Sequence, residues 1–170
     1  TDGSATLVKD TEYTVAYSSN TNAGTASVAV SGKGNYSGAV TKTFTINKAK
    51  TATASAANKT YNRGSQTGVS GSNVSWSGDT TGTNVGTYTA YATPTGNYAW
   101  SDGTTGQKTI TWTMSPKAIT SCTITLGTTD YTYDGVAKQP SVTVTDGSAT
   151  LVKDTEYTVA YSNNTNAGTA

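Results

Sequence analysis

The sequence has no histidine and only one cysteine, Cys122, among its 170 residues. Without histidine, neither histidine-based acid–base catalysis nor a histidine-ligated metal site can form. A single cysteine excludes an internal disulfide and a zinc site built from several thiolates. No hydrophobic run approaches the roughly 18 residues that a transmembrane helix requires. We therefore expect no membrane insertion of this segment.

Charged residues are also scarce. They make up 12% of the chain, and 11 Lys and Arg oppose 10 Asp and Glu, for a net charge of +1. This balance provides no electrostatic basis for binding nucleic acid. The carboxylates of Asp10 and Glu12 lie two residues apart, but Glu12 is out of phase with the apolar residues that follow it and should face solvent. We expect no enzyme activity, no catalytic residues, no metal and no cofactor.

Residues that favour helices are few, with three Leu, two Glu and one Met, whereas there are 38 Thr, 18 Gly and 11 Tyr. Threonine and tyrosine favour strands, and glycine favours turns. The content of Leu, Ile, Val and Phe is low enough to suggest disorder. Disordered chains, however, combine low hydrophobicity with high net charge and few aromatic residues, unlike this one. The composition predicts an all-β protein.

The sequence contains a long internal duplication. Residues 1–26 and 145–170 differ at one of 26 positions, where Ser19 corresponds to Asn163, and the offset between them (145 − 1) is 144 residues. Shorter motifs also repeat within this period: Asn-x-Gly-Thr at 22–25 and 84–87, and Gly-Asn-Tyr at 34–36 and 96–98. The chain therefore covers a little more than one period of a tandem array, and each period holds two diverged copies of one fold.

The repeats predict three parts. Residues 1–47 are the C-terminal part of one β module, residues 48–116 are a complete module, and residues 117–170 are the N-terminal part of the next. The linkers around 47–50 and 115–118 do not resemble flexible Gly/Ser tethers, so we expect a stiff rod of modules. A domain of about 70 residues is marginally stable alone, which favours support from neighbouring modules.

Several segments alternate with period two, as expected for strands buried on one face. The Asp146-Gly147 pair indicates a tight hairpin. Six or seven short strands per module favour tandem small immunoglobulin-like β-sandwich modules in an elongated array, although a small barrel or another compact β fold fits the pattern nearly as well. The alternating sets are Tyr13/Val15/Tyr17, Ala26/Val28/Val30, Phe44/Ile46, Tyr88/Ala90, Ile110/Trp112/Met114, Cys122/Ile124/Leu126, Val142/Val144 and Tyr157/Val159/Tyr161.

These motifs resemble the MBG-type and YDG-type repeats of large bacterial surface proteins. The resemblance lies in Tyr-Asp-Gly at 133–135, the run Leu-Val-Lys-Asp-Thr-Glu-Tyr-Thr-Val at 151–159, the turn at 164–169, the loop Gly-Asn-Tyr-Ser-Gly at 34–38 and the strand at 42–49. It covers the two partial modules well and the central module loosely. It implies an exported, cell-surface or secreted chain with a stalk or adhesion role and no catalytic residues.

Two sets of residues are candidates for further chemistry. Trp76, Tyr98 and Trp100 in the central module are candidates for stacking on a glycan, whereas Trp112 should belong to the core. Lys42 and Lys108 occupy equivalent positions in the last strand of two copies and are candidates for self-formed isopeptide bonds with an asparagine or aspartate. Such a bond needs a buried, neutral lysine. Lysines on edge strands also protect sheets from aggregation.

The leading functional hypothesis is a structural stalk or fibre segment of a repetitive bacterial surface or extracellular adhesin-like protein. Its partners would be neighbouring repeats of the same chain or identical chains in a fibre. One alternative is a carbohydrate-binding surface module that recognises a host or environmental glycan. Another is a fibre subunit that assembles by strand complementation, with residues 1–47 of one chain completing the module begun at 117–170 of the next.

Overall fold

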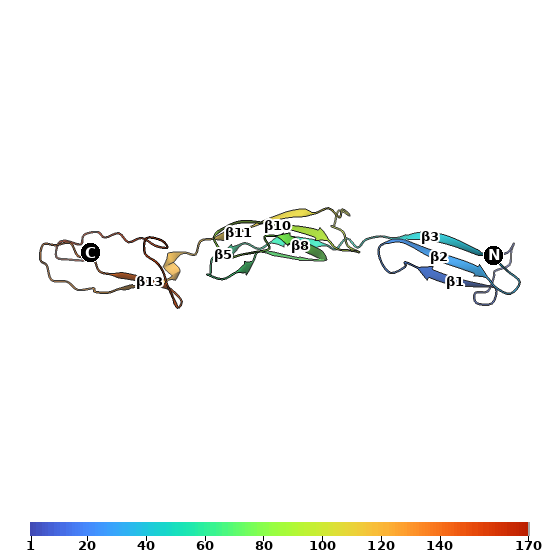
Figure 1. Cartoon of the computed structure of the whole chain (residues 1–170), viewed down its shortest axis with the longest axis horizontal. Helices are drawn as coiled ribbons and strands as arrows, with labels where there is room; N and C mark the ends of the chain where they lie inside the picture. Colours follow the sequence, from blue (N-terminus) through green and yellow to red (C-terminus); the bar gives the residue numbers. More distant parts are fainter. Residues whose placement is uncertain (170) are drawn as a thin grey trace. The chain divides into compact units, whose positions relative to one another are not determined.

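The computed structural model describes residues 1–169 and confirms an all-β protein. Its contacts divide the chain into two compact units, Thr1–Ser115 and Pro116–Ala170 (Figure 1). Within the described residues, the only helix is one 3₁₀ turn, η1 (Ile119–Ser121). The first unit contains the expected parts 1–47 and 48–115, and the second contains the expected part from 117 onward. Ala170, the last residue of that part, lies outside the described residues.

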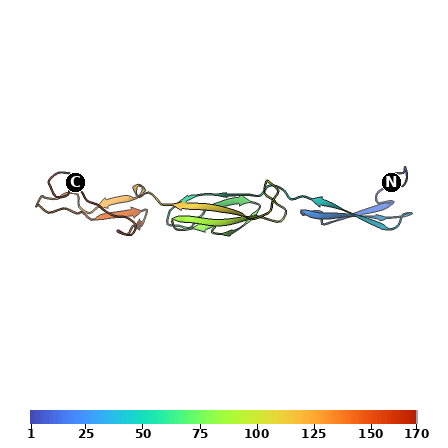
Figure 2. The same ribbon diagram turned by 90° about the horizontal axis from the view of Figure 1, so that it is seen from above.

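The N-terminal sheet has three antiparallel strands, β1 (Tyr13–Ser18), β2 (Gly24–Gly32) and β3 (Ala39–Ile46), in the order β1-β2-β3. They form a single twisted layer when viewed from above (Figure 2). The register pairs Tyr17 with Val28 and Val28 with Lys42. Paired residues share a face, so one face is apolar and the other carries Ser, Thr and Ala. The apolar face comprises Tyr13, Val15, Tyr17, Ala26, Val28, Val30, Val40, Phe44 and Ile46, with Lys42 among them.

Several small sheets make up the central part of the chain. The largest has the order β5-β11-β10-β8, in which β10 pairs antiparallel with β11 and β8, and β5 pairs parallel with β11. Two further pairs are β4-β7 and β6-β9. The strand bounds are β4 (Thr53–Ala56), β5 (Lys59–Thr60), β6 (Gln66–Thr67), β7 (Val69–Ser72), β8 (Val74–Gly78), β9 (Thr81–Gly82), β10 (Gly86–Pro94) and β11 (Lys108–Ser115).

The hydrophobic core belongs almost entirely to this central part. Of the ten buried apolar side chains, all but Ala26 and Val144 lie between Ala52 and Met114. One cluster joins Val69 of β7 to Ala90 of β10 and to Trp112 and Met114 of β11. A second cluster contains Ala52, Ala92 and Trp100. Because these residues come from different sheets, the core holds the small sheets against the four-stranded one.

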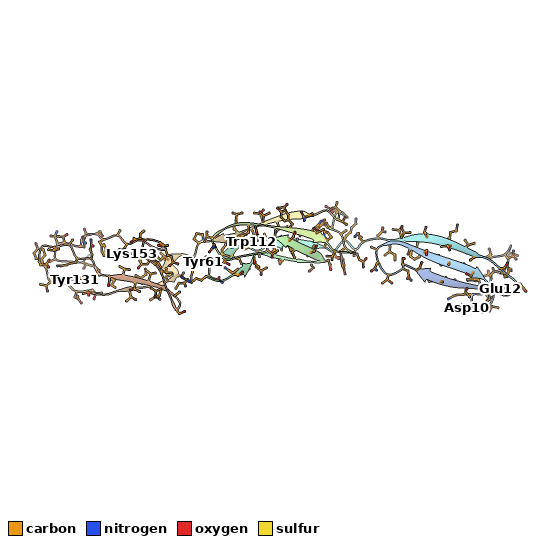
Figure 3. All side chains as sticks on the ribbon, viewed as in Figure 1. Asp10, Glu12, Tyr61, Trp112, Tyr131 and Lys153 are labelled. Atoms are coloured by element: carbon orange, nitrogen blue, oxygen red, sulfur yellow. The ribbon has the colours of Figure 1, made fainter. Side chains whose placement is uncertain are left out.

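Trp112 is fully buried at the centre of this core, which confirms the prediction from its alternation with Ile110 and Met114 (Figure 3). Its ring stacks on Tyr88 with 4.4 Å between centroids, and its indole N–H donates to the carbonyl of Asp79 at 2.7 Å. A Cβ atom on Gly68 would lie 1.9 Å from the indole. The absence of a side chain at this glycine is therefore what leaves room for the ring.

The C-terminal unit contains η1, β12 (Thr123–Leu126), β13 (Val142–Asp146) and β14 (Ala149–Thr150), in the sheet order β12-β13-β14. The predicted Asp146-Gly147 hairpin is confirmed. Asp146 pairs with Ala149, and Gly147 has the positive φ of 60° that such a tight turn favours. Val144 is the only buried apolar side chain in the described part of this unit.

The duplicated sequence forms a strand in one copy and not in the other. Residues 13–18 form β1, paired along its whole length with β2. Residues 157–162 have the same sequence but are not a strand, so the prediction of a strand through Tyr157, Val159 and Tyr161 was wrong. The reason is pairing: in the described C-terminal unit, no segment equivalent to β2 follows. The strand is specified by its partner rather than by its own sequence.

The loop before this segment is the same in both copies. The N–H of Glu12 donates to the carbonyl of Val8 at 2.9 Å, and that of Glu156 to Val152 at 2.8 Å. In turn, the glutamate carboxylates accept the N–H groups of Val8 and Val152, at 2.6 and 2.8 Å. Glu12 therefore closes a local loop at the start of β1 (Figure 3). This loop depends only on its own residues.

The apolar faces predicted for the two outer parts are largely uncovered. Ile124 and Leu126 of β12 are 55% and 45% exposed, and Phe44 of β3 is 40% exposed. The expectation that these alternating residues are buried was therefore wrong for the separate parts. Alternation does place them on one face, but the described residues provide no second layer over that face.

Candidate functional site

The first notable site is a junction inside the first unit, where the turn before β2 meets the loop after β10. The side-chain carbonyl of Asn97 accepts the backbone N–H of Ala23 at 2.8 Å. The side-chain N–H of Asn97 donates to the side-chain oxygen of Asn22 at 2.9 Å. One asparagine thus satisfies a donor and an acceptor across the junction, and the half-buried setting of Ala23 and Asn97 favours this arrangement.

The linker after β3 is held at the same place. The N–H of Ala49 donates to the carbonyl of Asn97 at 2.8 Å, and the N–H of Ala99 donates to the carbonyl of Ala49 at 2.9 Å. Ala49 and Tyr98 form a parallel β-bridge. The Lys48 ammonium group also donates to the carbonyl of Gly96. Backbone pairing therefore fixes this linker against the central part of the chain.

The sequence contained a signal for this junction, but its role was missed. Asn22 belongs to the repeated Asn-x-Gly-Thr motif and Asn97 to the repeated Gly-Asn-Tyr motif, and both motifs were interpreted only as turns. A turn explains one such motif by itself. It does not explain why both motifs recur in the same order, and contact between them provides that explanation.

The second site is an open cavity of about 710 Å³ in the C-terminal unit. Its apolar lining comes from β12, β13 and the segment around 159–161, and Tyr131, labelled in Figure 3, also belongs to it. Apolar side chains in its lining include Leu126, Tyr131, Tyr133, Val142, Val159 and Tyr161. A cavity this large beside a single buried side chain, Val144, is what half of a module core leaves open.

One side of this cavity is fixed by polar contacts. The hydroxyl of Tyr161 donates to the carbonyl of Pro140 at 2.6 Å, and that of Tyr157 to Val142 at 2.9 Å. Lys138 and Asp134 form an ion pair at 2.5 Å. The hydrogen bond from Lys138 lowers the pKa of the Asp134 carboxyl, with a smaller effect from the N–H of Val136. These contacts hold residues 134–142 against the second copy of the duplicated segment.

The three aromatic residues proposed for glycan stacking do not form an exposed platform. Trp100 is only 3% exposed, and its indole N–H donates to the carbonyl of Gly106 at 2.7 Å. Trp76 and Tyr98 are half-buried and pack on the same cluster as Trp100. Sequence reasoning missed the buried position of Trp100 because it lies in a loop, where no alternation indicates which side faces the core.

Lys108 lies above Trp100 and is exposed. Its ammonium nitrogen is 4.6 Å from the ring centroid and 4.0 Å from a carboxylate oxygen of Asp102. Hydrogen bonds from the hydroxyl and backbone N–H of Thr104 lower the pKa of Asp102, with a smaller effect from Lys108. This is a surface cation–π and ion-pair arrangement. It does not provide the desolvated lysine that isopeptide formation requires.

Lys42, the other candidate lysine, lies on β3 at the row of Val28 and Tyr17. It is exposed because the apolar face on which it lies is uncovered. The structure therefore does not bring Lys42 and Lys108 together, and neither is buried. Cys122 is half-buried beside β12.

The described residues offer no further site of these kinds. Within residues 1–169, no group of three or more potential metal-ligating side chains gathers. Over the same residues, no helix has the length and apolar character of a membrane span. Comparison of the chain with protein-family models, curated proteins and solved structures found no match. The resemblance to MBG-type and YDG-type repeats therefore depends on the sequence motifs alone.

Proposed function

We propose that this chain is a structural segment of a tandemly repeated protein of a bacterial surface or extracellular fibre. In this proposal, each module is a small immunoglobulin-like β-sandwich, and the array spaces a binding part from the cell or forms a filament itself. The array requires no catalytic residue. Its relevant surfaces are the junction at Asn97 and the faces through which module halves meet.

The observation that carries the proposal is the pair of complementary half-modules around one duplicated sequence. In the first copy, residues 1–26 are followed by β2 and β3 and have nothing on their apolar face. In the second copy, the same sequence is preceded by residues 117–144 and encloses the open cavity. Joining both sets of contacts to one copy gives a sheet on each side of one core. A continuing array would provide this at every period.

The junction supports the same proposal. Repeated arrays gain stability from contacts between adjacent units. The motif Asn-x-Gly-Thr in one module copy and Gly-Asn-Tyr in the next meet at Asn22 and Asn97, and both motifs recur in the other copy. Uncharged amide contacts of this kind are insensitive to salt, which suits a protein outside the cell.

The test is to extend the chain after residue 170 with a copy of residues 27–48. The added strands should pair with residues 157–162 and fill the cavity of the C-terminal unit. Scanning calorimetry should then show the transition of this unit at a higher temperature. An extension of the same composition in scrambled order is the control. Equal transitions for the two extended chains would contradict the proposal.

A further inference from the structure

The uncovered face of the N-terminal sheet has a binding partner that the chain itself displays. In the C-terminal unit, residues 134–142 lie against the second copy of the duplicated sequence. The hydroxyl of Tyr161 donates to the carbonyl of Pro140 at 2.6 Å. The side-chain N–H of Asn164 donates to the carbonyl of Lys138 at 2.9 Å, and the N–H of Lys138 donates to Asn164 at 2.7 Å. These bonds show how residues 117–144 recognise this sequence.

In the first copy, the same recognition elements are exposed. Tyr17 corresponds to Tyr161 and is 61% exposed, and Asn20 corresponds to Asn164 and is also exposed. Beside Tyr17 on the same face, Val40 and Phe44 are 58% and 40% exposed. A contiguous apolar sheet face of this kind marks an interaction surface.

We propose that residues 117–144 of a second copy of this chain bind the apolar face of β1-β2-β3. The hydroxyl of Tyr17 would donate to the carbonyl of Pro140 of the second copy. Asn20 would exchange hydrogen bonds with Lys138 of the second copy. The inference rests on the module pairing of the proposed function and adds that a separate molecule can provide the missing half.

The second copy's residues 117–144 already hold their own duplicated segment, so the two segments compete. The incoming residues 1–47 bring β2 and β3, which the internal segment lacks. Their apolar side chains can enter the cavity of about 710 Å³ that the internal segment leaves open. The exchange therefore buries more apolar surface than it exposes, and higher protein concentration favours it.

Charge does not oppose this contact. The chain has a net charge of +1, so two copies repel each other little. Lys42 is the one charged residue on the sheet face, and Asp130 is the carboxylate in the cavity lining. Because the two contact surfaces differ and lie at opposite ends of the sequence, the association is head to tail and produces open chains rather than a closed pair.

The duplication allows one substitution to be tested at two positions with opposite expected results. Tyr17→Asp places a charge on the receiving face and should weaken self-association roughly tenfold or more. Tyr161→Asp makes the same chemical change in the internal competitor, so it should strengthen self-association. Ala16→Asp, on the opposite face of the same strand, is the matched control and should behave as the unmodified chain.

Sedimentation equilibrium of the full chain over a wide range of concentrations provides the measurement. The mass should rise above 17.4 kDa with increasing concentration. Val40→Asp lies outside the duplicated segment and should weaken association as Tyr17→Asp does, so it decides the matter even if Tyr161→Asp unfolds the C-terminal unit. A mass of 17.4 kDa at every concentration, or association unchanged by Val40→Asp, would overturn the inference.

The two proposals can fail separately. If the extension with residues 27–48 stabilises the C-terminal unit but the unmodified chain stays monomeric, modules form only within one chain and the inference alone is wrong. If the extension has no effect, the module pairing itself is wrong, and the proposed function fails with it.

Discussion

Gly68→Ala tests whether Trp112 is the centre of the only substantial core. The added Cβ would lie 1.9 Å from the indole, whereas ordinary contacts begin at 3.4 Å, so about 1.5 Å (3.4 − 1.9) must be gained by movement. Gly68 does not have a positive φ, so the substitution introduces no backbone strain. The predicted effect therefore comes from the clash alone.

Neither side of this clash can move freely. The N–H of Gly68 donates to Thr80 at 3.0 Å, and its carbonyl accepts the N–H of Ala57 at 2.8 Å. The indole is held by its hydrogen bond to Asp79 and by the stack on Tyr88. Overpacking costs about 1–3 kcal/mol, and we expect a value near the upper end, about 3 kcal/mol.

Urea unfolding followed by tryptophan fluorescence measures this effect, because all three tryptophans lie between residues 76 and 112. With a slope of about 2 kcal/mol per molar urea, the midpoint should fall by roughly 1.5 M. Gly106→Ala is the control, since its Cβ meets nothing within 4 Å. It should leave stability unchanged or raise it by about 0.4–1 kcal/mol. A Gly68→Ala midpoint equal to that of the unmodified chain would refute this description of the core.

Three further changes test the junction, the local loop and the acidic ion pair. Asn97→Ala should accelerate hydrogen exchange at the Ala23 amide, measured by NMR, with little effect on unfolding of the core, because it removes side-chain bonds across the junction only. Glu12→Ala should speed exchange at the loop amide that its carboxylate accepts, since that bond is local and solvent-accessible. Asp134→Asn should flatten the acid sensitivity of the C-terminal unit. The lowered pKa of this carboxyl gives stability that is present above its ordinary value of about 4 and lost as the pH falls through the lowered value, which circular dichroism during acid titration would follow.

Local sequence was sufficient to predict some elements. The Asp146-Gly147 hairpin follows from the positive φ that glycine accepts, and the buried position of Trp112 follows from alternation in a strand that is covered by other sheets. The duplication and its period also needed nothing beyond the sequence. These features depend on residues close in the chain or on a pattern that one strand carries by itself.

Other elements could not be predicted because they depend on distant partners. The sequence Tyr-Thr-Val-Ala-Tyr-Ser is a strand at 13–18 and not at 157–162, so its own residues do not decide its structure. Trp100 is buried by its loop and by β-sheet residues that no local pattern connects to it. The junction at Asn97 joins motifs about 75 residues apart. Each case requires knowledge of which segments meet.

Hydrogen exchange at the two copies of the duplicated sequence tests the central claim most directly. The residue that differs, Ser19 in one copy and Asn163 in the other, gives the two peptides different masses, so mass spectrometry can follow both in one sample. At low protein concentration, residues 13–18 should be protected and residues 157–162 should exchange quickly. Extension of the chain with residues 27–48 should then protect the second copy to the level of the first. Equal protection of both copies before the extension, or an unprotected second copy after it, would contradict the account.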